Sequence, residues 1–299
     1  MLDLRRLSML REVAISGSIT AAARALGLSA PAVSQQLGRL ERETGLVLLE
    51  AAGRGVHLTP IALELVQRTE RVLEELESAE AVVLAGREGL NGVVRIAGFS
   101  TFASGALPLF INTLAERHPS LVVEFVQLDP EAAMNELTAR RADLILADEY
   151  PGFPRLPGRG LVRTVVATET IAAYLPVGSD PRLTVAECAE LPWAMEPRGS
   201  EALQWAQIAC RNLGFEPQVR YESPELHMHR GLVEAGLAAA FLPVSLADAS
   251  AHKLTPSPLF PASLHRTIYA VTRSGAENRP GVRACLRTIE EIVAPALRG

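Results

Sequence analysis

The feature that most constrains this sequence is a short helix, a glycine turn and a second capped helix near the N-terminus. Small residues of high helix propensity indicate a helix over residues 19–26, and Ser18 can cap it. Gly27 ends that helix, because the residue after a helix often takes a left-handed conformation. Ser29 then caps a further helix, with Pro31 in its first turn. This order predicts a helix-turn-helix, although a three-helix core packed only for stability would show the same spacing.

The segments on either side extend this unit. Apolar residues at helical spacing over 4–13 predict a preceding helix that ends near Gly17. Beyond the helix-turn-helix, two glycines flank Arg54 before a short run over 56–58, which predicts a two-stranded wing. The tip of such a wing would place Arg54 against a phosphate or in a minor groove.

A long helix with an apolar seam follows the wing. Thr59 and Pro60 are typical of a helix start. Apolar residues and one threonine recur along the helix in steps of three and four residues, which is coiled-coil spacing. This seam consists of Ile61, Leu65, Thr69, Val72, Leu76, Ala79 and Val83. A second copy of the chain is its favoured partner, because dimeric DNA-binding proteins match the twofold symmetry of their operators. Gly86, Gly89 and Gly92 then predict a hinge.

The rest of the chain alternates strands and helices. Strands expected over 93–97, 121–126 and 144–147 enclose two helices, a pattern that predicts a parallel sheet covered on both faces. A second set of alternating elements follows between about 162 and 241, and a strand over 266–271 returns to the first set. Two such lobes joined by two crossing strands form the architecture of periplasmic solute-binding proteins.

Composition excludes several functional classes. Net charge is −5, yet the first 60 residues hold seven arginines against five acids, so phosphate contacts are expected there. Lys253 is the only lysine, which excludes a P-loop, and no Rossmann fingerprint or zinc-protease motif is found. We expect no cofactor and no metal, since three scattered cysteines do not form a disulfide or zinc framework. Without a signal peptide or a membrane-length apolar run, a cytoplasmic protein with no membrane contact is expected.

The N-terminal residues resemble those of the LysR-type transcriptional regulators. The resemblance is carried by Gly17-Ser18-Ile19-Thr20-Ala21-Ala22-Ala23, by Leu28 to Leu37, by Arg39-Leu40-Glu41, by Gly45 to Glu50 and by Gly53 to Pro60. It extends over the whole chain. It implies an α+β multidomain protein with a winged helix-turn-helix, a long coiled-coil linker helix and a two-lobed α/β effector-binding domain like that of periplasmic binding proteins.

The resemblance also implies domain limits and partners. The expected limits are 1–59 for the DNA-binding domain, 60–91 for the linker helix and hinge, 92–299 for the effector-binding domain, 92–162 with 267–299 for lobe I, and 163–266 for lobe II. The expected partners are a double-stranded DNA operator, a small anionic metabolite as effector, a second copy through the linker helix in a homodimer or homotetramer, and RNA polymerase. The chain would then be a sequence-specific transcriptional regulator and not an enzyme.

The recognition helix and the wing supply the expected DNA contacts, namely Ser29, Pro31, Ala32, Ser34, Gln35, Gln36, Arg39 and Arg54. Pro31 and Ala32 would touch thymine methyl groups, and the polar residues would contact bases or phosphates. The family usually carries glutamine or a basic residue at four positions where this chain differs, which are Ala30, Gln35, Gly38 and Ala51. Each departure removes a donor to a base edge or a phosphate.

The effector is expected in the crevice beyond the C-terminal ends of the strands. Ser100 and Thr101 follow the first strand and open a helix, which suits a carboxylate, although plain helix capping is an alternative. Asp148 follows another strand and would favour a ligand with an amine or several hydroxyl groups, although a solvent-facing carboxylate is an alternative. Four further candidates come from the facing lobe: Arg198, which also suits a solvated loop, Ser200, Glu222, and Phe241, which suits the core better than a ligand stack.

Two other functions are open from the residues alone. The two lobes by themselves would suit a solute-binding protein, but the head, the seam and the missing export signal argue against it. A hydrolase using Ser100 with a histidine is disfavoured, because the second glycine of a nucleophile elbow is missing. His227 and His229 lie two positions apart on an expected helix and point in different directions, which argues against a shared metal ion.

The departures from the family pattern predict a weak salt dependence of DNA binding. Fewer basic groups neutralise fewer phosphates, so fewer counterions are released on binding. The logarithm of the binding constant, plotted against the logarithm of salt concentration, should fall less steeply than for a relative with the usual arginines. An equally steep slope would contradict this expectation.

Overall fold

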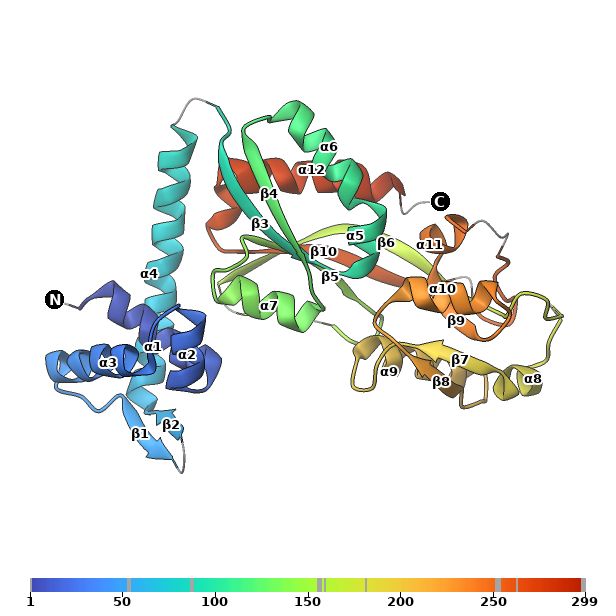
Figure 1. Cartoon of the computed structure of the whole chain (residues 1–299), viewed down its shortest axis with the longest axis horizontal. Helices are drawn as coiled ribbons and strands as arrows, with labels where there is room; N and C mark the ends of the chain where they lie inside the picture. The colour runs from blue at the N-terminus through green and yellow to red at the C-terminus, as the bar shows by residue number, and fades with distance from the viewer. Residues whose placement is uncertain are drawn as a thin grey trace.

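The computed structural model describes residues 2–52, 55–86, 89–154, 158, 160–180, 182–250, 254–261 and 263–296, without the side chains of 51, 52, 55 and 294–296. Figure 1 shows three parts in chain order, which are a small head, a long helix that rises from it and a two-lobed body. Among the described helices, none combines the length and apolar character needed to cross a membrane.

The head is the winged helix-turn-helix that the sequence predicts. Its elements are α1 (Leu4–Ser16), α2 (Ile19–Ala25), α3 (Ala30–Thr44), β1 (Leu49–Ala52) and β2 (Gly55–Leu58), and the two strands pair antiparallel. The Ser18 and Ser29 hydroxyls accept backbone N–H groups of α2 and α3, which confirms both predicted caps. Gly27 in the turn has a φ of 66°, a conformation that glycine adopts without strain.

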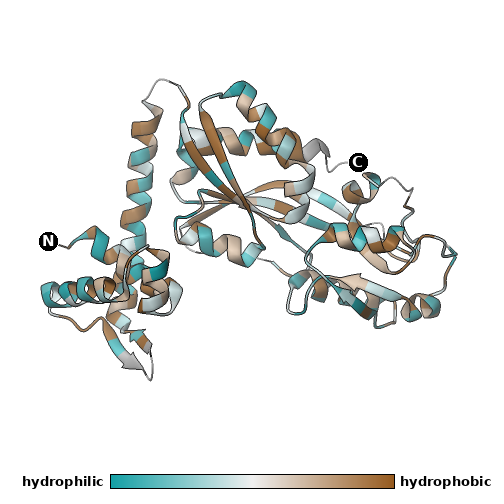
Figure 2. Ribbon diagram, viewed as in Figure 1, coloured by the Kyte–Doolittle hydropathy of each residue, from teal (hydrophilic) through white to brown (hydrophobic). Residues whose placement is uncertain are grey.

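The linker helix α4 (Pro60–Ala85) presents two different faces. The buried face consists of Ala62, Thr69, Leu73, Glu77 and Ala81. Most of the expected coiled-coil seam is on the other face, where Ile61, Val72, Leu76 and Val83 are between 42% and 62% exposed. Figure 2 shows hydrophobic and hydrophilic bands alternating along α4. Thr69 and Leu65 differ from the rest of the seam, because Thr69 is buried and Leu65 packs against the core of the head within the same chain.

Lobe I is a parallel sheet covered by helices. Its elements are β3 (Gly92–Gly98), α5 (Ser100–Gly105), α6 (Leu107–Arg117), β4 (Leu121–Gln127), α7 (Pro130–Thr138) and β5 (Leu144–Glu149). β3 pairs in parallel with β4 and β5, as the alternating pattern predicts. After a short 3-10 helix, η1 (Ala276–Asn278), the closing helix α12 (Pro280–Ala296) returns to this lobe and contacts α6 and β3.

Lobe II repeats the alternation of strands and helices. Its elements are α8 (Val185–Glu190), β7 (Pro192–Met195), α9 (Glu201–Asn212), β8 (Gln218–Glu222), α10 (Leu226–Glu234), β9 (Ala239–Pro243) and α11 (Val244–Asp248). β7 pairs in parallel with β8 and β9. The core of this lobe is aromatic, with Trp193, Trp205, Phe215, Phe241 and Phe260 packed against one another.

Two strands connect the lobes, as expected. β6 (Leu161–Tyr174) pairs with β10 (His265–Arg273) over most of its length and then with β9 through residues 171–174. β10 in turn pairs with β5 of lobe I. The order β4-β3-β5-β10-β6-β9-β7-β8 therefore runs through both lobes, and the predicted return of the chain near 266–271 is confirmed.

A buried ionic contact fixes α4 to lobe I. Glu77 is 2% exposed and accepts hydrogen bonds from Arg140, after α7, and from Arg273, at the end of β10. The Arg273 Nε lies 2.6 Å from the Glu77 carboxylate. Gly275 permits close packing here, because a Cβ at this position would lie 3.0 Å from the Glu74 carbonyl oxygen. The linker helix is therefore attached to lobe I by charge and by close packing.

Candidate functional site

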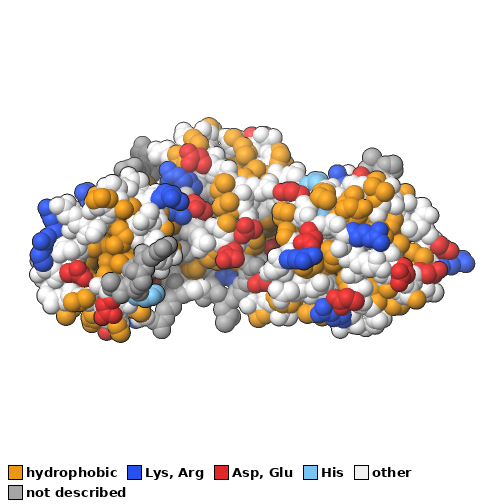
Figure 3. Space-filling model, turned by 60° about the horizontal axis from the view of Figure 1, so that its bottom comes forward, with side chains coloured by type: hydrophobic (Ala, Val, Ile, Leu, Met, Phe, Trp, Pro, Cys, Tyr) orange, Lys and Arg blue, Asp and Glu red, His pale blue; other side chains and the backbone are white. Residues whose placement is uncertain are grey.

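The outer side of α3 carries most of the residues predicted to contact DNA. Exposed members are Ser29, Pro31, Ser34, Gln35 and Arg39, and partly buried members are Ala32 and Gln36. The opposite side of α3 packs into the core of the head, which fixes the polar side outward. Gln36 is held in place by Arg6 of α1, whose Nε donates to its Oε1 at 3.2 Å. Figure 3 shows basic side chains gathered at the outer edge of the head.

The wing is anchored to the recognition helix by Glu41. Its carboxylate accepts the backbone N–H of Leu48 at 2.9 Å and that of Leu49 at 3.2 Å. The Thr59 hydroxyl donates to the carbonyl of Val47 at 2.9 Å on the other side. Sequence reasoning noted Glu41 only as part of the family resemblance, whereas the structure gives it a positioning role. Arg54, predicted at the wing tip, lies outside the described residues.

A cavity of about 250 Å³ lies between the two lobes, and we call it the interlobe cavity. Lobe I contributes residues at or just beyond the C-terminal ends of its parallel strands, among them Ser100, Thr101, Gln127, Asp129 and Asp148. Lobe II contributes Glu196, Glu225 and Leu226. Three predicted effector-site residues, Ser100, Thr101 and Asp148, thus meet at one cavity beyond the C-terminal ends of the strands, where α/β folds bind ligands.

The other four predicted effector-site residues lie elsewhere, and none lines the described wall of the interlobe cavity. The Arg198 side chain is 86% exposed, and its Nε donates to Glu222 at 2.9 Å. The Ser200 hydroxyl caps α9 by accepting a backbone N–H at 3.1 Å. Phe241 belongs to the core of lobe II, where its ring stacks on Trp193 with centroids 5.4 Å apart.

Arg266 on β10 lines the interlobe cavity and binds two of its lobe I residues. This buried guanidinium donates to Glu169 at 2.8 Å, to Asp148 at 2.9 Å and to the Thr101 hydroxyl at 2.8 Å. Burial lowers the pKa of Arg266, but Glu169 and Asp148 outweigh burial and raise it above its ordinary value. Sequence reasoning missed Arg266 as a site residue. The only sequence signal is a charged residue at the start of an apolar strand.

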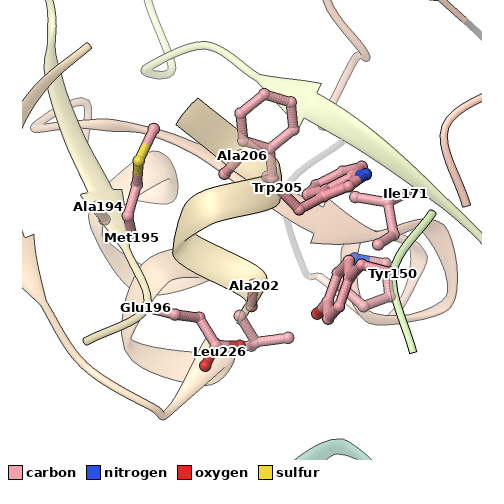
Figure 4. A pocket seen from close by; sticks show the side chains of 11 residues that line it. Tyr150, Ile171, Ala194, Met195, Glu196, Ala202, Trp205, Ala206 and Leu226 are labelled. Carbon is pink, nitrogen blue, oxygen red and sulfur yellow. The ribbon is translucent and has the colours of Figure 1, made fainter. Parts of the chain in front are cut away.

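A smaller cavity, of about 20 Å³, lies in lobe II beside the interlobe cavity and shares Glu196 and Leu226 with it. Figure 4 shows the Glu196 carboxyl and the Tyr150 hydroxyl at the same end of this small cavity, with Ala202 and Leu226 between them. Burial raises the pKa of Tyr150, so its hydroxyl stays neutral. Sequence reasoning missed both Glu196 and Tyr150.

Two side-chain contacts near the start of α10 join the lobes. The Gln127 Nε2 donates to Glu225 at 2.7 Å, and the His227 Nε2 lies 2.6 Å from the Ser104 Oγ. Next to the second contact is another cavity, of about 290 Å³, which Arg266 also borders. The wall around Arg266 therefore separates two cavities.

Two family models match this chain. The "LysR substrate binding domain" matches residues 87–294, and the "Bacterial regulatory helix-turn-helix protein, lysR family" matches residues 4–63. The chain belongs to the LysR family.

This LysR-family chain is similar to known regulators over half of its length or more. The "Transcriptional dual regulator GltC" of Bacillus subtilis is 25% identical over 249 residues, which cover 82% of this chain and 81% of that protein. The regulator ClcR of Pseudomonas putida is 32% identical over 150 residues, 50% of this chain and 51% of that protein. A full-length OxyR variant of Pseudomonas aeruginosa has the same fold, with a TM-score of 0.66 at 18% identity over 100% of this chain and 97% of that chain. The full-length regulator CbnR in complex with its target DNA also has this fold, with a TM-score of 0.53 at 21% identity. The match covers 97% of this chain and 99% of CbnR.

Family membership confirms the resemblance drawn from the residues. The chain is a DNA-binding transcriptional regulator with a substrate-binding domain, and it is not an enzyme. The alternatives of a free solute-binding protein and of a hydrolase using Ser100 are therefore wrong.

Arg266→Met in this LysR-family regulator should destabilise the effector-binding domain by about 3–5 kcal/mol, because Glu169 and Asp148 would keep buried charges without a counterion. Arg198→Met is the matched control, since it breaks an exposed pair and should cost at most about 1 kcal/mol. Trp193 and Trp205 both lie in the lobe II core, so tryptophan fluorescence during urea denaturation measures the loss. Equal losses in the two variants would contradict the assigned role of Arg266.

Proposed function

We propose that this regulator binds a DNA operator as a dimer and that a small metabolite in the interlobe cavity controls its DNA-bound state. The observation that carries this proposal is the meeting of Ser100, Thr101 and Asp148 at a cavity between two lobes. The chain also presents an exposed side of the recognition helix α3, and α4 joins the DNA-binding head to the two-lobed effector-binding domain.

Direct DNA contacts would come from the exposed side of α3. Ser34, Gln35 and Arg39 are one to five positions apart on this helix and face outward. Glutamine can pair with adenine through two hydrogen bonds, and arginine with guanine or a phosphate. Ser29, Pro31, Ala32 and Gln36 would add contacts at the start of the helix, and Arg54 would act from the wing.

The exposed seam of α4 supports a homodimer. Val72, Leu76, Ala79 and Val83 keep heptad spacing on a side of the helix that is open in the single chain. A second copy would bury this side and set two recognition helices at a fixed spacing. Exposed Leu109, Val122 and Val126, on α6 and β4, offer a further apolar surface for a tetramer. Contact with RNA polymerase is an expectation from the family resemblance alone.

The effector would present a carboxylate to Ser100 and Thr101. The Thr101 oxygen already accepts a hydrogen bond from Arg266, so its O–H is free to donate to a ligand oxygen. The Ser100 hydroxyl lines the same cavity. Asp148 faces the cavity as well, and its charge would disfavour a second carboxylate.

Control would act through a shift between conformations of the two lobes. A ligand that touches both lobes favours the conformation in which both sets of contacts form. A change in lobe closure would change the angle between subunits, the distance between recognition helices and the bend of the DNA.

Gln35→Ala and Arg39→Ala should each weaken operator binding, by about 1–3 kcal/mol if the residue contacts a base edge. If Arg39 contacts a phosphate instead, its loss should weaken binding to all sequences and reduce the salt slope by about 0.9. Gel-shift titrations on DNA upstream of the gene measure these effects. The matched controls are Gln204→Ala and Arg220→Ala, exposed residues of lobe II that should leave binding unchanged. Unchanged binding in both α3 variants would disprove the assigned DNA-binding face.

A thermal-shift screen of small carboxylates, amino acids and phenolics should identify stabilising ligands. A ligand at 100 times its dissociation constant stabilises the folded state by about 2.7 kcal/mol. Ser100→Ala and Thr101→Ala should each weaken a true effector about tenfold, since each removes a hydrogen bond to a charged group. Ser200→Ala serves as control, because that hydroxyl caps a helix away from the cavity. Equal affinity in both site variants would show that the ligand binds elsewhere.

A further inference from the structure

Away from Ser100 and Thr101, the interlobe cavity is acidic. Four carboxyl groups from both lobes line it, those of Asp129, Asp148, Glu196 and Glu225. Among the described lining residues, Arg266 is the only lysine or arginine. A ligand that enters this cavity therefore meets more negative than positive groups.

Arg266 is already committed to partners within the protein. Its Nε donates to Glu169, one terminal nitrogen donates to Asp148, and the other lies 2.8 Å from Thr101 and 2.6 Å from Glu169. Glu169 and Asp148 provide two carboxylates for the single positive charge of the guanidinium. An anionic ligand would compete with Glu169 and Asp148 for the guanidinium, and displacement of either would leave a buried carboxylate without its counterion.

Glu196 differs from the other three acids of the cavity. Asp148 pairs with Arg266, Asp129 accepts a backbone N–H of α7 at 2.9 Å, and Glu225 accepts from Gln127 at 2.7 Å. Glu196 has no hydrogen-bond partner in the described part of the chain; its side chain is partly buried and faces the interlobe cavity. Its carboxyl is therefore available to a hydrogen-bond donor or a positive charge of a ligand in this cavity.

We propose that Glu196 receives a protonated amine of the effector, so that the effector is a small amino-carboxylate or amine and not a dicarboxylate. This inference rests on the proposed function, because it names the ligand class of the same cavity. In an amino-carboxylate, the carboxylate would face Ser100 and Thr101, and the ammonium group would lie between Glu196 and the neighbouring acids.

The charges around Glu196 couple ligand binding to proton release. Burial, then Asp148 at the end of β5 and Glu225 before α10, raise the pKa of Glu196 to about 8, while Arg266 on β10 opposes them. Tyr150, after β5, faces the same small cavity and stays neutral. At pH 7 and without a ligand, the Glu196 carboxyl is therefore mostly protonated. An ammonium group that binds there favours the ionised carboxylate and displaces that proton.

A series of four-carbon probes tests the ligand class on the full-length chain. 4-Aminobutyrate and 1,4-diaminobutane carry ammonium groups, whereas butyrate and succinate carry only carboxylates. Calorimetric titration should show that both ammonium probes bind and that succinate binds more weakly than either. Glu196→Gln, which keeps the shape of the side chain, should weaken the ammonium probes at least tenfold, as expected for the loss of a charge-assisted hydrogen bond. Glu222→Gln, in the same lobe but outside the cavity, should change neither.

Proton release provides a second readout that a purely structural role of Glu196 would not produce. Titrations at pH 7 in buffers of different ionisation enthalpy should show close to one proton released per ammonium probe in the unchanged protein, and none in Glu196→Gln. Below pH 8, the affinity for the ammonium probes should increase about tenfold for each unit by which the pH is raised, because the ionised fraction of Glu196 increases. The amines themselves stay protonated over this range, because their pKa values resemble that of lysine, about 10.4. In Glu196→Gln the affinity should not change with pH.

Several outcomes would overturn this inference. The first is that succinate or butyrate binds as tightly as 4-aminobutyrate. The second is that the ammonium probes bind the unchanged protein and Glu196→Gln with equal affinity. The third is that the ammonium probes do not bind at millimolar concentration. Each of these results leaves the proposed DNA-binding function intact, because operator binding is measured separately by gel shift without any probe. If succinate binds as tightly as 4-aminobutyrate and Ser100→Ala weakens it, the effector cavity is supported and only the amine is excluded.

Discussion

The pairing of Arg266 with Glu169 and Asp148 is the interaction on which the effector-binding domain depends. It joins the neighbouring strands β5, β10 and β6 at the point where the two lobes meet. Thr101 brings the start of α5 into the same network, and Ser245 brings in α11 of lobe II through Glu169. Because the guanidinium is buried, its loss would leave carboxylates in an apolar surrounding. Arg266 therefore fixes Thr101 and Asp148, two of the residues that line the interlobe cavity.

The head and the order of strands could be predicted because their signals are local. Ser18, Gly27 and Ser29 act on backbone within a few positions, so the turn and the capped helices can be recognised from neighbouring residues. The strands of lobe I appear as apolar runs for the same reason. Arg266 and Asp148 are 118 positions apart, and no local pattern indicates that they meet. Long-range pairing therefore limited what the sequence could show about the site.

The predicted effector residues differ in outcome for a related reason. The rule that ligands bind beyond the C-terminal ends of parallel strands located Ser100 and Asp148, since it depends only on topology. It does not give the direction of a side chain in a loop. Arg198 follows β7 and Glu222 ends β8, but neither lines the cavity, and the two side chains form an ion pair with each other. Glu196 lies two positions before Arg198 and turns inward, a difference that tertiary packing decides.

The attachment of α4 at Glu77 makes the linker helix a lever arm. Glu77 lies 17 residues from Pro60, the end of α4 next to the head, which is about 26 Å at ~1.5 Å per residue. If α4 turns rigidly with lobe I, a rotation of about 10° at Glu77 moves that end by about 4–5 Å. This displacement is a little more than one base-pair step along B-form DNA, at ~3.4 Å per step. A small rotation of the effector-binding domain would therefore shift the recognition helix by about one base pair.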